Sequence, residues 1–179
     1  TDAAGNLFLI ETETDTVRRI DAGTHIITTV AGGGVTTPGF GAATTMDLGE
    51  IEGLAIDDAD NLYVSTFMQV FKVDLGTGIL SVFAGTGVPG FSGDGGPAQD
   101  ATFSNIWGLD VRGDALFIAD SNNNRIRAVV PPPLPDDLII ELATSQALLD
   151  SLTAVPGSIL MINVDGREYL LIANATSVG

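Results

Sequence analysis

Residues 84–129 read AGTGVPGFSGDGGPAQDATFSNIWGLDVRGDALFIADSNNNRIRAV. The stretch opens with a glycine-rich loop and continues with two apolar runs, 106–111 and 115–119, separated by a short polar turn. A second polar turn at 120–124 leads into a third run that ends at Val129. Short apolar runs bounded by Gly, Asn and Asp are typical of strands joined by tight turns. The stretch therefore predicts a small antiparallel sheet that follows a long loop.

The same order of elements recurs along the chain. The central apolar run appears four times at spacings of 54 or 55 residues, as Leu7-Phe8-Leu9, Leu62-Tyr63-Val64, Leu116-Phe117-Ile118 and Leu170-Leu171-Ile172. Two further series follow the same order, namely 17–20, 70–73 and 126–129, and 27–30, 80–83 and 139–142. Self-similarity at a fixed period is the signature of a repeat architecture, so we interpret the chain as a series of equivalent units.

The second repeat is complete and defines the unit. It predicts four antiparallel strands at 53–57, 62–66, 70–73 and 79–83, and four short antiparallel strands per unit describe a β-propeller blade. We expect an all-β chain with a short helical turn at 145–152 as its main exception. The predicted segments are a partial blade at 1–34, a blade at 48–85, a blade at 103–143 with a Pro-rich insertion, and a partial blade at 157–179.

These segments predict about three and a half blades in a single segment spanning residues 1–179. Propellers have about 4 to 8 blades, so we expect an incomplete ring whose end sheets need partners. Three partners satisfy that need, and we rank them in this order: further blades of the same longer polypeptide, a second copy that closes a ring, and head-to-tail stacking into a fibre.

Composition excludes several classes of protein. Hydrophobic residues make up 45% of the 179 residues and charged residues 17%, so the chain can bury a sizeable core. Seven basic against 23 acidic residues give a formal charge of −16, which opposes binding to nucleic acid. There is no cysteine, and no apolar stretch is long enough to span a bilayer. The sequence starts at Thr1, from which we expect either that a leader was removed or that the chain is part of a longer protein.

The repeat resembles that of NHL-repeat β-propellers, in the bacterial or teneurin-like form. The matching residues are Ala84–Gly87, Gly90–Ala98, Ile118–Asp120 and Asn123–Arg127, with Asp2–Leu7 and Ile27–Gly34 in the first repeat. The second repeat departs from the pattern, because it carries Phe67-Met68-Gln69 where the third has its Asn-rich turn. The resemblance implies a propeller fold.

Some propellers similar to this one are lactonases or lyases that hold a metal at the central channel. The only histidine, His25, falls in a predicted outer turn, away from such a channel. The segments leading into the inner strands offer Glu50, Glu52 and Asn105 as metal ligands, together with Asp110 and Asn163. The alternative interpretation is a solvated acidic mouth that binds no metal.

Two other groups of polar residues admit a functional and a structural interpretation. Asp94 lies in a loop whose composition resembles a Ca²⁺ loop, although the spacing of an EF-hand is absent. The alternative is a structural loop between blades, in which Asp94 caps backbone N–H groups. Asp120 and Arg125 resemble an acid and base pair, and the alternative is a polar turn in which Arg125 stacks on a neighbouring strand. Trp107 either fills the space between blades or stacks on a ligand.

These observations favour a non-enzymatic scaffold without a resident cofactor. Its expected function is to present a surface that binds a protein or a glycan, as part of a larger secreted or surface protein of bacterial type. The candidate surface residues are Trp107, Asp94, Asn122, Asn123 and Arg125. The alternatives are a metal-dependent lactonase or lyase and a structural subunit of an extracellular fibre.

Overall fold

The computed structural model describes residues 1–130 and the backbone of 159–164 and 167–172. The chain forms two compact units, Thr1–Pro131 and Pro132–Gly179. The regular secondary structure of the described residues consists of β-strands and three single-turn 3-10 helices. These helices are η1 (Ala43–Thr45), η2 (Ala98–Asp100) and η3 (Ser121–Asn123). Within these ranges no helix is long and apolar enough to cross a membrane. The predicted all-β fold with almost no helix is confirmed.

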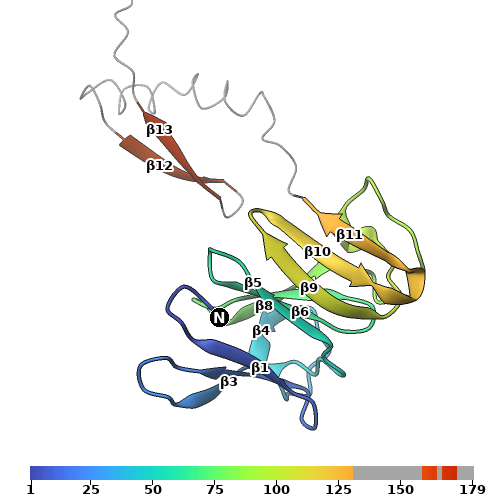
Figure 1. The fold of residues 1–179 in the computed structure, drawn as a ribbon, viewed down its shortest axis with the longest axis horizontal. Helices are drawn as coiled ribbons and strands as arrows, with labels where there is room; N and C mark the ends of the chain where they lie inside the picture. The colour runs from blue at the N-terminus through green and yellow to red at the C-terminus, as the bar shows by residue number, and fades with distance from the viewer. Residues whose placement is uncertain (131–158, 165–166, 173–179) are drawn as a thin grey trace, which may run out of the picture. The chain divides into compact units, whose positions relative to one another are not determined.

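The strands of the first unit form three antiparallel sheets that follow one another along the chain (Figure 1). The first sheet has the order β1-β2-β3, built from β1 (Leu7–Glu11), β2 (Thr16–Ile20) and β3 (Ile27–Gly32). The central sheet has the order β4-β8-β7-β6-β5, built from β4 (Phe40–Ala42), β5 (Gly53–Ile56), β6 (Asn61–Ser65), β7 (Val70–Asp74) and β8 (Ile79–Ala84). The third sheet has the order β11-β10-β9, built from β9 (Ile106–Arg112), β10 (Ala115–Asp120) and β11 (Arg125–Val129).

The second unit contains one described sheet, the hairpin of β12 (Ile159–Val164) and β13 (Arg167–Ile172). The strand expected at 139–142 and the helical turn expected at 145–152 lie outside the described residues. Across the described residues the sheets do not close into a ring.

The four strands predicted for the second repeat lie within one residue of their expected ends. The fifth strand of that sheet, β4, is not among the predicted strands. It pairs with β8 at the sheet edge, with Phe40 opposite Ser81 and Ala42 opposite Ile79. A run of three residues around Gly41 carries no alternation of apolar and polar side chains, so sequence patterning does not reveal it.

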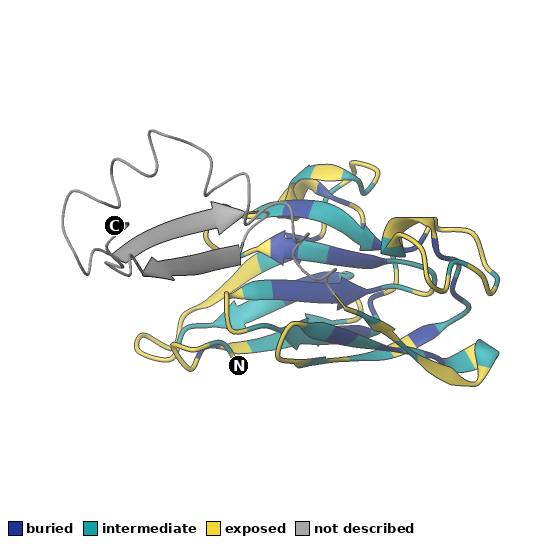
Figure 2. Cartoon of the chain, turned by 90° about the horizontal axis from the view of Figure 1, so that it is seen from above, coloured by how far each residue is buried: buried dark blue, intermediate teal, exposed yellow. Residues whose placement is uncertain are grey.

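The core consists of two clusters, one on each face of the central sheet. Successive side chains of a strand point to opposite faces, and β6 obeys this rule. Leu62 and Val64 belong to the cluster shared with the first sheet, which includes Val17. Tyr63 belongs to the cluster shared with the third sheet, which includes Ile118. The buried residues follow the strands, and exposed residues concentrate in the loops (Figure 2).

Phe8, Tyr63, Phe117 and Leu171 occupy equivalent positions in the four repeats, where we expect side chains to pack between neighbouring sheets. Phe8 packs against the first cluster and Tyr63 is buried in the second. Phe117 is half-buried, and its neighbours Leu116 and Ile118 enter the second cluster instead. Leu171 lies among residues whose side chains are not described.

The long linkers between sheets repeat as closely as the strands. Each contains a 3-10 turn closed by a backbone bond, from Met46 N to the Ala43 carbonyl and from Ala101 N to the Ala98 carbonyl. The residues that follow are buried at matching positions, which are Met46, Leu48 and Ile51 before β5, and Ala101, Phe103 and the first residue of β9, Ile106. Burial of these side chains anchors each linker to the core.

The turns that lead into β1 and β6 are fixed by aspartate side chains at equivalent positions of the first two repeats. The Asp2 carboxylate accepts the backbone N–H of Asn6 at 2.8 Å, and the Asp57 carboxylate accepts that of Asn61 at 2.8 Å. Asp57 also accepts the Tyr63 hydroxyl at 3.0 Å. Burial, followed by the nearby Asp57 charge, raises the pKa of Tyr63, so its hydroxyl stays a donor.

Candidate functional site

The glycine-rich loop 85–103 is fastened to β11 by one guanidinium group. Arg127 donates to the Asp94 Oδ1 at 2.6 Å, to the Ser92 carbonyl at 2.8 Å and to the Thr102 carbonyl at 2.8 Å. Its side chain is only 9% exposed. The guanidinium carbon lies 4.6 Å from the ring centre of Phe103, so the charge also stacks on a buried aromatic ring. These contacts hold the middle of the loop and its C-terminal end.

A fully buried carboxylate completes this fastening. Asp120, at the end of β10, accepts the backbone N–H of Ser104 at 2.8 Å. Both of its oxygens accept the Asn123 side-chain amide at 2.9 Å, and the same amide donates to the Gly90 carbonyl at 2.8 Å. The Arg127 Nη1 lies 3.8 Å from the Asp120 Oδ2, so Arg127 supplies the opposite charge that a buried carboxylate requires.

At the exposed edge of this cluster, the Arg125 side chain stacks on the ring of Phe91. The Arg125 guanidinium carbon lies 3.7 Å from the centre of the Phe91 ring. The Arg125 Nε donates to the Asn123 carbonyl at 3.0 Å, which fixes the side chain over the ring. The expected stacking of Arg125 therefore takes place on the linker and not on a neighbouring strand. Asn124, with φ of 54°, occupies the left-handed region that Asn tolerates in such a turn.

The surface candidates fall into two groups. Asp94, Asn123 and Arg125 are engaged in the fastening just described, so their polar atoms serve the fold first. Asn122 and Trp107 are exposed. Trp107 lies on β9 and does not belong to either core cluster among the described residues. The sequence analysis did not identify Arg127 and Phe103 as the centre of this cluster, although Arg127 is the last residue of the matching segment Asn123–Arg127.

The metal candidates lie on equivalent segments that enter two inner strands. Glu50 and Glu52 precede β5, and Asn105 precedes β9. The Asn105 Oδ1 is buried with no hydrogen-bond partner, and its backbone has φ of 61°. Within the described part of the chain, no three His, Cys, Asp or Glu side chains are grouped so that they could hold a metal ion. His25 lies in the exposed β2–β3 turn, and Asn163 is a residue whose side chain is not described.

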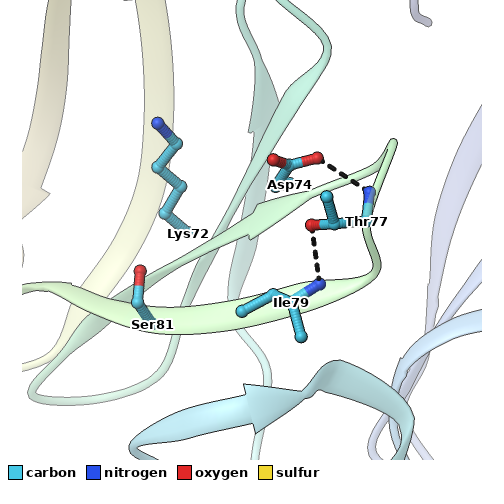
Figure 3. Close-up of a pocket in the computed structure, with 5 residues that line it drawn as sticks. All are labelled: Lys72, Asp74, Thr77, Ile79 and Ser81. Carbon is cyan, nitrogen blue, oxygen red and sulfur yellow. Dashed lines mark hydrogen bonds between the residues drawn. The ribbon is translucent and has the colours of Figure 1, made fainter. Parts of the chain in front are cut away.

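Two open hollows lie away from this cluster. The first, of about 330 Å³, lies on the β7–β8 hairpin and is shown in Figure 3. Its lining consists of Lys72, Asp74, Thr77, Ile79 and Ser81. The Asp74 carboxylate is occupied by the Thr77 backbone N–H at 2.9 Å, and this bond lowers the pKa of Asp74. In this hollow the Asp74 carboxylate is already used by the turn, and the other polar residues of the lining are Lys72, Thr77 and Ser81.

The second hollow, of about 440 Å³, lies between the first sheet and two turns of the central sheet. Its polar lining includes Asp2, Asn6, Arg19, Asp60 and Asp74. Asp2 is bonded to Asn6 and Arg19 to Asp21, the latter at 3.2 Å. These pairs leave an open groove whose lining is mostly acidic among its charged residues.

Comparison with known proteins relates the chain to a fold alone. No protein-family model and no curated protein sequence matches it. A solved structure of a protein of unknown function from Bacteroides thetaiotaomicron VPI-5482 is similar to it, with 20% sequence identity and a TM-score of 0.60. The match covers 69% of this chain and 32% of that protein, so the chain spans about a third of its length.

Proposed function

We propose that the chain is a segment of an NHL-type β-propeller scaffold that binds a protein or a glycan through the loops at one end of its sheets. The proposal of blades is supported by the consecutive order β8-β7-β6-β5 within the five-stranded central sheet, by the recurring linkers and by the face-to-face packing of consecutive sheets. We place this scaffold outside the cell or at its surface, as part of a larger bacterial protein.

The loop end comprises the turns 12–15, 66–69 and 121–124, the linker 85–105 and the two ends of the linker 33–52, whose middle part, β4, runs along β8 as far as Ile79. Pairing registers put these segments at one end, because the central strands begin or finish there at Gly53, Ser65, Val70 and Ala84. A backbone bond of 3.0 Å from Ser121 N to the Asn105 carbonyl joins two of these segments directly.

Exposed apolar side chains at the loop end are the observation that carries the proposal. Val35 is 95% exposed, and Val88, Phe91 and Phe67 are also exposed. Val35 and Val88 each follow a glycine near the start of their linker, so the exposure repeats from one linker to the next. Apolar side chains that gather on a polar, acidic surface mark interaction sites.

The fastening by Arg127 and Asp120 gives these loops a fixed geometry. A loop that is already ordered loses less conformational entropy on binding, so its contacts yield more affinity. A scaffold needs this property, whereas an enzyme needs in addition a reactive group. The described cluster uses its charged groups on one another and leaves none converging on an open position.

The test is a binding screen of the purified full chain against arrays of purified glycans and of extracellular protein domains. We expect at least one class of glycan or protein domain to bind the chain. The binding signal should fall at least tenfold when Val35 and Val88 are both changed to Ser. The matched control is Val130→Ser, because Val130 is an exposed valine that follows the opposite end of β11. Equal binding by the loop-end variant and the control would contradict the proposal.

The competing proposal is a metal-dependent lactonase or lyase, and one observation favours it. The buried Asn105 Oδ1 lacks a donor partner and is therefore available to a cation. Elemental analysis of the purified chain, with lactone and ester hydrolysis assays, separates the two functions. A stoichiometric metal and hydrolysis that both disappear when Glu50, Glu52 and Asn105 are changed to Ala would establish the enzyme instead of the scaffold.

A further inference from the structure

Asp94 is followed by Gly95 and Gly96 in the loop that Arg127 fastens to β11. The main-chain nitrogen of the residue after an aspartate can attack the side-chain carboxyl carbon and close a cyclic succinimide. A side chain on that next residue hinders the attack, and glycine has none. A Cβ at Gly95 would meet nothing within 4 Å, so the space beside this residue is open in the described structure. Asp94-Gly95 is the one Asp-Gly pair among residues 1–130.

The Asp94 carboxylate is tied to a guanidinium group that is itself fixed. The Arg127 Nε and Nη2 donate to the Asp94 Oδ1 at 2.9 Å and 2.6 Å. Arg127 also donates to the Ser92 and Thr102 carbonyls, and its side chain is only 9% exposed. Two bonds from a fixed donor to one oxygen restrict rotation of the carboxyl group toward the Gly95 nitrogen.

A tight turn fixes the backbone at the same place. The Gly96 N–H donates to the Gly93 carbonyl at 3.1 Å, so Asp94 and Gly95 are the central residues of the turn. The φ of 82° at Gly95 is the value that the third residue of a type II turn requires. Ring closure brings the Asp94 carboxyl carbon within bonding distance of the Gly95 nitrogen, so the bonds from Arg127 must break first. The reaction therefore requires local opening of the loop.

We propose that Asp94-Gly95 is a site of spontaneous conversion to isoaspartate, and that Arg127 protects this site while the loop is fastened. In the first step, a bond forms between the Gly95 nitrogen and the Asp94 Cγ. The hydroxyl of the protonated carboxyl group and the amide proton leave as one water. In the second step, one water adds to the ring and opens it. Opening at the former main-chain carbonyl gives isoaspartate, and opening at Cγ restores Asp94.

Conversion unfastens the loop permanently. In isoaspartate the Cβ becomes part of the main chain, and the former main-chain carboxyl group becomes the side group. The main chain between Gly93 and Gly95 is then longer by one carbon, so the new carboxylate does not take the position of the Asp94 Oδ1. Arg127 loses its two bonds to Asp94. This change concerns the loop itself and is independent of which ligand the loop end binds.

The test is to incubate the folded full chain at neutral pH and to map isoaspartate by mass spectrometry. Trypsin cleaves after Lys72 and Arg112, so Asp94 falls in the peptide 73–112, and fragmentation of that peptide locates the isoaspartate. A synthetic peptide of residues 85–103 gives the rate without the fold. We expect the folded chain to convert about tenfold more slowly than the peptide, because only the opened loop reacts.

Two variants of Arg127 separate its effect from that of the rest of the fold. Arg127→Ala should convert about tenfold faster than the unchanged chain, because the loop opens more often. Arg127→Lys keeps the charge but not the planar fork, so it should also convert faster, and it preserves the test should Arg127→Ala not fold. Gly53→Ala is the matched control, because it disturbs β5 and β9 and leaves the bonds of Arg127 in place. This control should convert at the rate of the unchanged chain.

Equal rates in the folded chain and the peptide would overturn the proposal, as would Arg127 variants that convert no faster than Gly53→Ala. Hydrogen exchange of the purified isoaspartyl chain tests the release of the loop. The Thr102 N–H donates to the Ser92 carbonyl at 3.3 Å, and it should exchange faster after conversion. Unchanged exchange at Thr102 would show that the converted loop stays fastened, and this result too would overturn the proposal.

Discussion

Arg127 is the residue on which the order of the glycine-rich loop depends most. It bonds to two backbone carbonyls and to Asp94, and it stacks on Phe103. Arg127→Ala leaves these acceptors without a donor, so we expect the free energy of unfolding to fall by roughly 2–4 kcal/mol. Denaturant unfolding measures the change.

The matched control is Arg112→Ala. Arg112 also pairs with an aspartate, Asp110, at 2.9 Å, but its side chain is 81% exposed. An exposed ion pair contributes little, and we expect a change within about 0.5 kcal/mol. Similar losses in the two variants would show that Arg127 does not fasten the loop.

The turn aspartates Asp21 and Asp74 make stability depend on pH. The backbone N–H of Thr24 donates to Asp21 and that of Thr77 donates to Asp74, and these bonds hold the pKa of both carboxyl groups below the usual 3.8. A lowered pKa stabilises the fold above the unfolded-state value, and this stability is lost as the pH falls through the folded-state value. We expect the denaturant midpoint to fall as the pH drops below about 3.8.

A variant with Asp21→Asn and Asp74→Asn tests this assignment. The asparagine oxygen accepts the same N–H groups but does not titrate. We expect a shallower loss of the midpoint on acidification, measured by unfolding at several pH values. An equally steep loss in wild type and variant would assign the acid sensitivity to other carboxylates.

At the scale of elements, the inner strands β5 and β9 approach each other through glycine. A Cβ on Gly53 would lie 2.9 Å from the Ser65 Oγ and 3.2 Å from the Gly108 Cα. Gly53→Ala therefore requires the two strands to separate, and we expect a loss of about 1–3 kcal/mol. Gly39→Ala is the control, because nothing lies within 4 Å of a Cβ there. Equal stability of the two variants, measured by thermal unfolding, would exclude close packing of these strands.

The sequence predicts those elements whose pattern is local. The four strands of the second repeat are predictable because apolar residues alternate between turns rich in Gly, Asn and Asp. The contacts of Arg127 and Asp94 join residues 33 apart, and no local pattern encodes such a pair. The exposure of Trp107 depends on which sheets cover β9, so it too follows from packing and not from the residue type.

At the scale of the whole molecule, consecutive sheets of the first unit stack face to face. The central sheet sends alternate side chains of β6 into different clusters, with Leu62 and Val64 on one side and Tyr63 on the other. Because both faces of the central sheet are buried, this sheet lies between the first and the third. The same stacking brings the loops of the loop end close together. The binding surface proposed at the loop end depends on this stacking.

The most direct test is a set of proton–proton NMR contacts from these three neighbouring residues. We predict contacts from the Tyr63 ring to the methyl groups of Leu116 and Ile118, and from the Leu62 and Val64 methyl groups to Val17. Contacts from Tyr63 to Val17, or from Leu62 and Val64 to Ile118, would contradict the stacking.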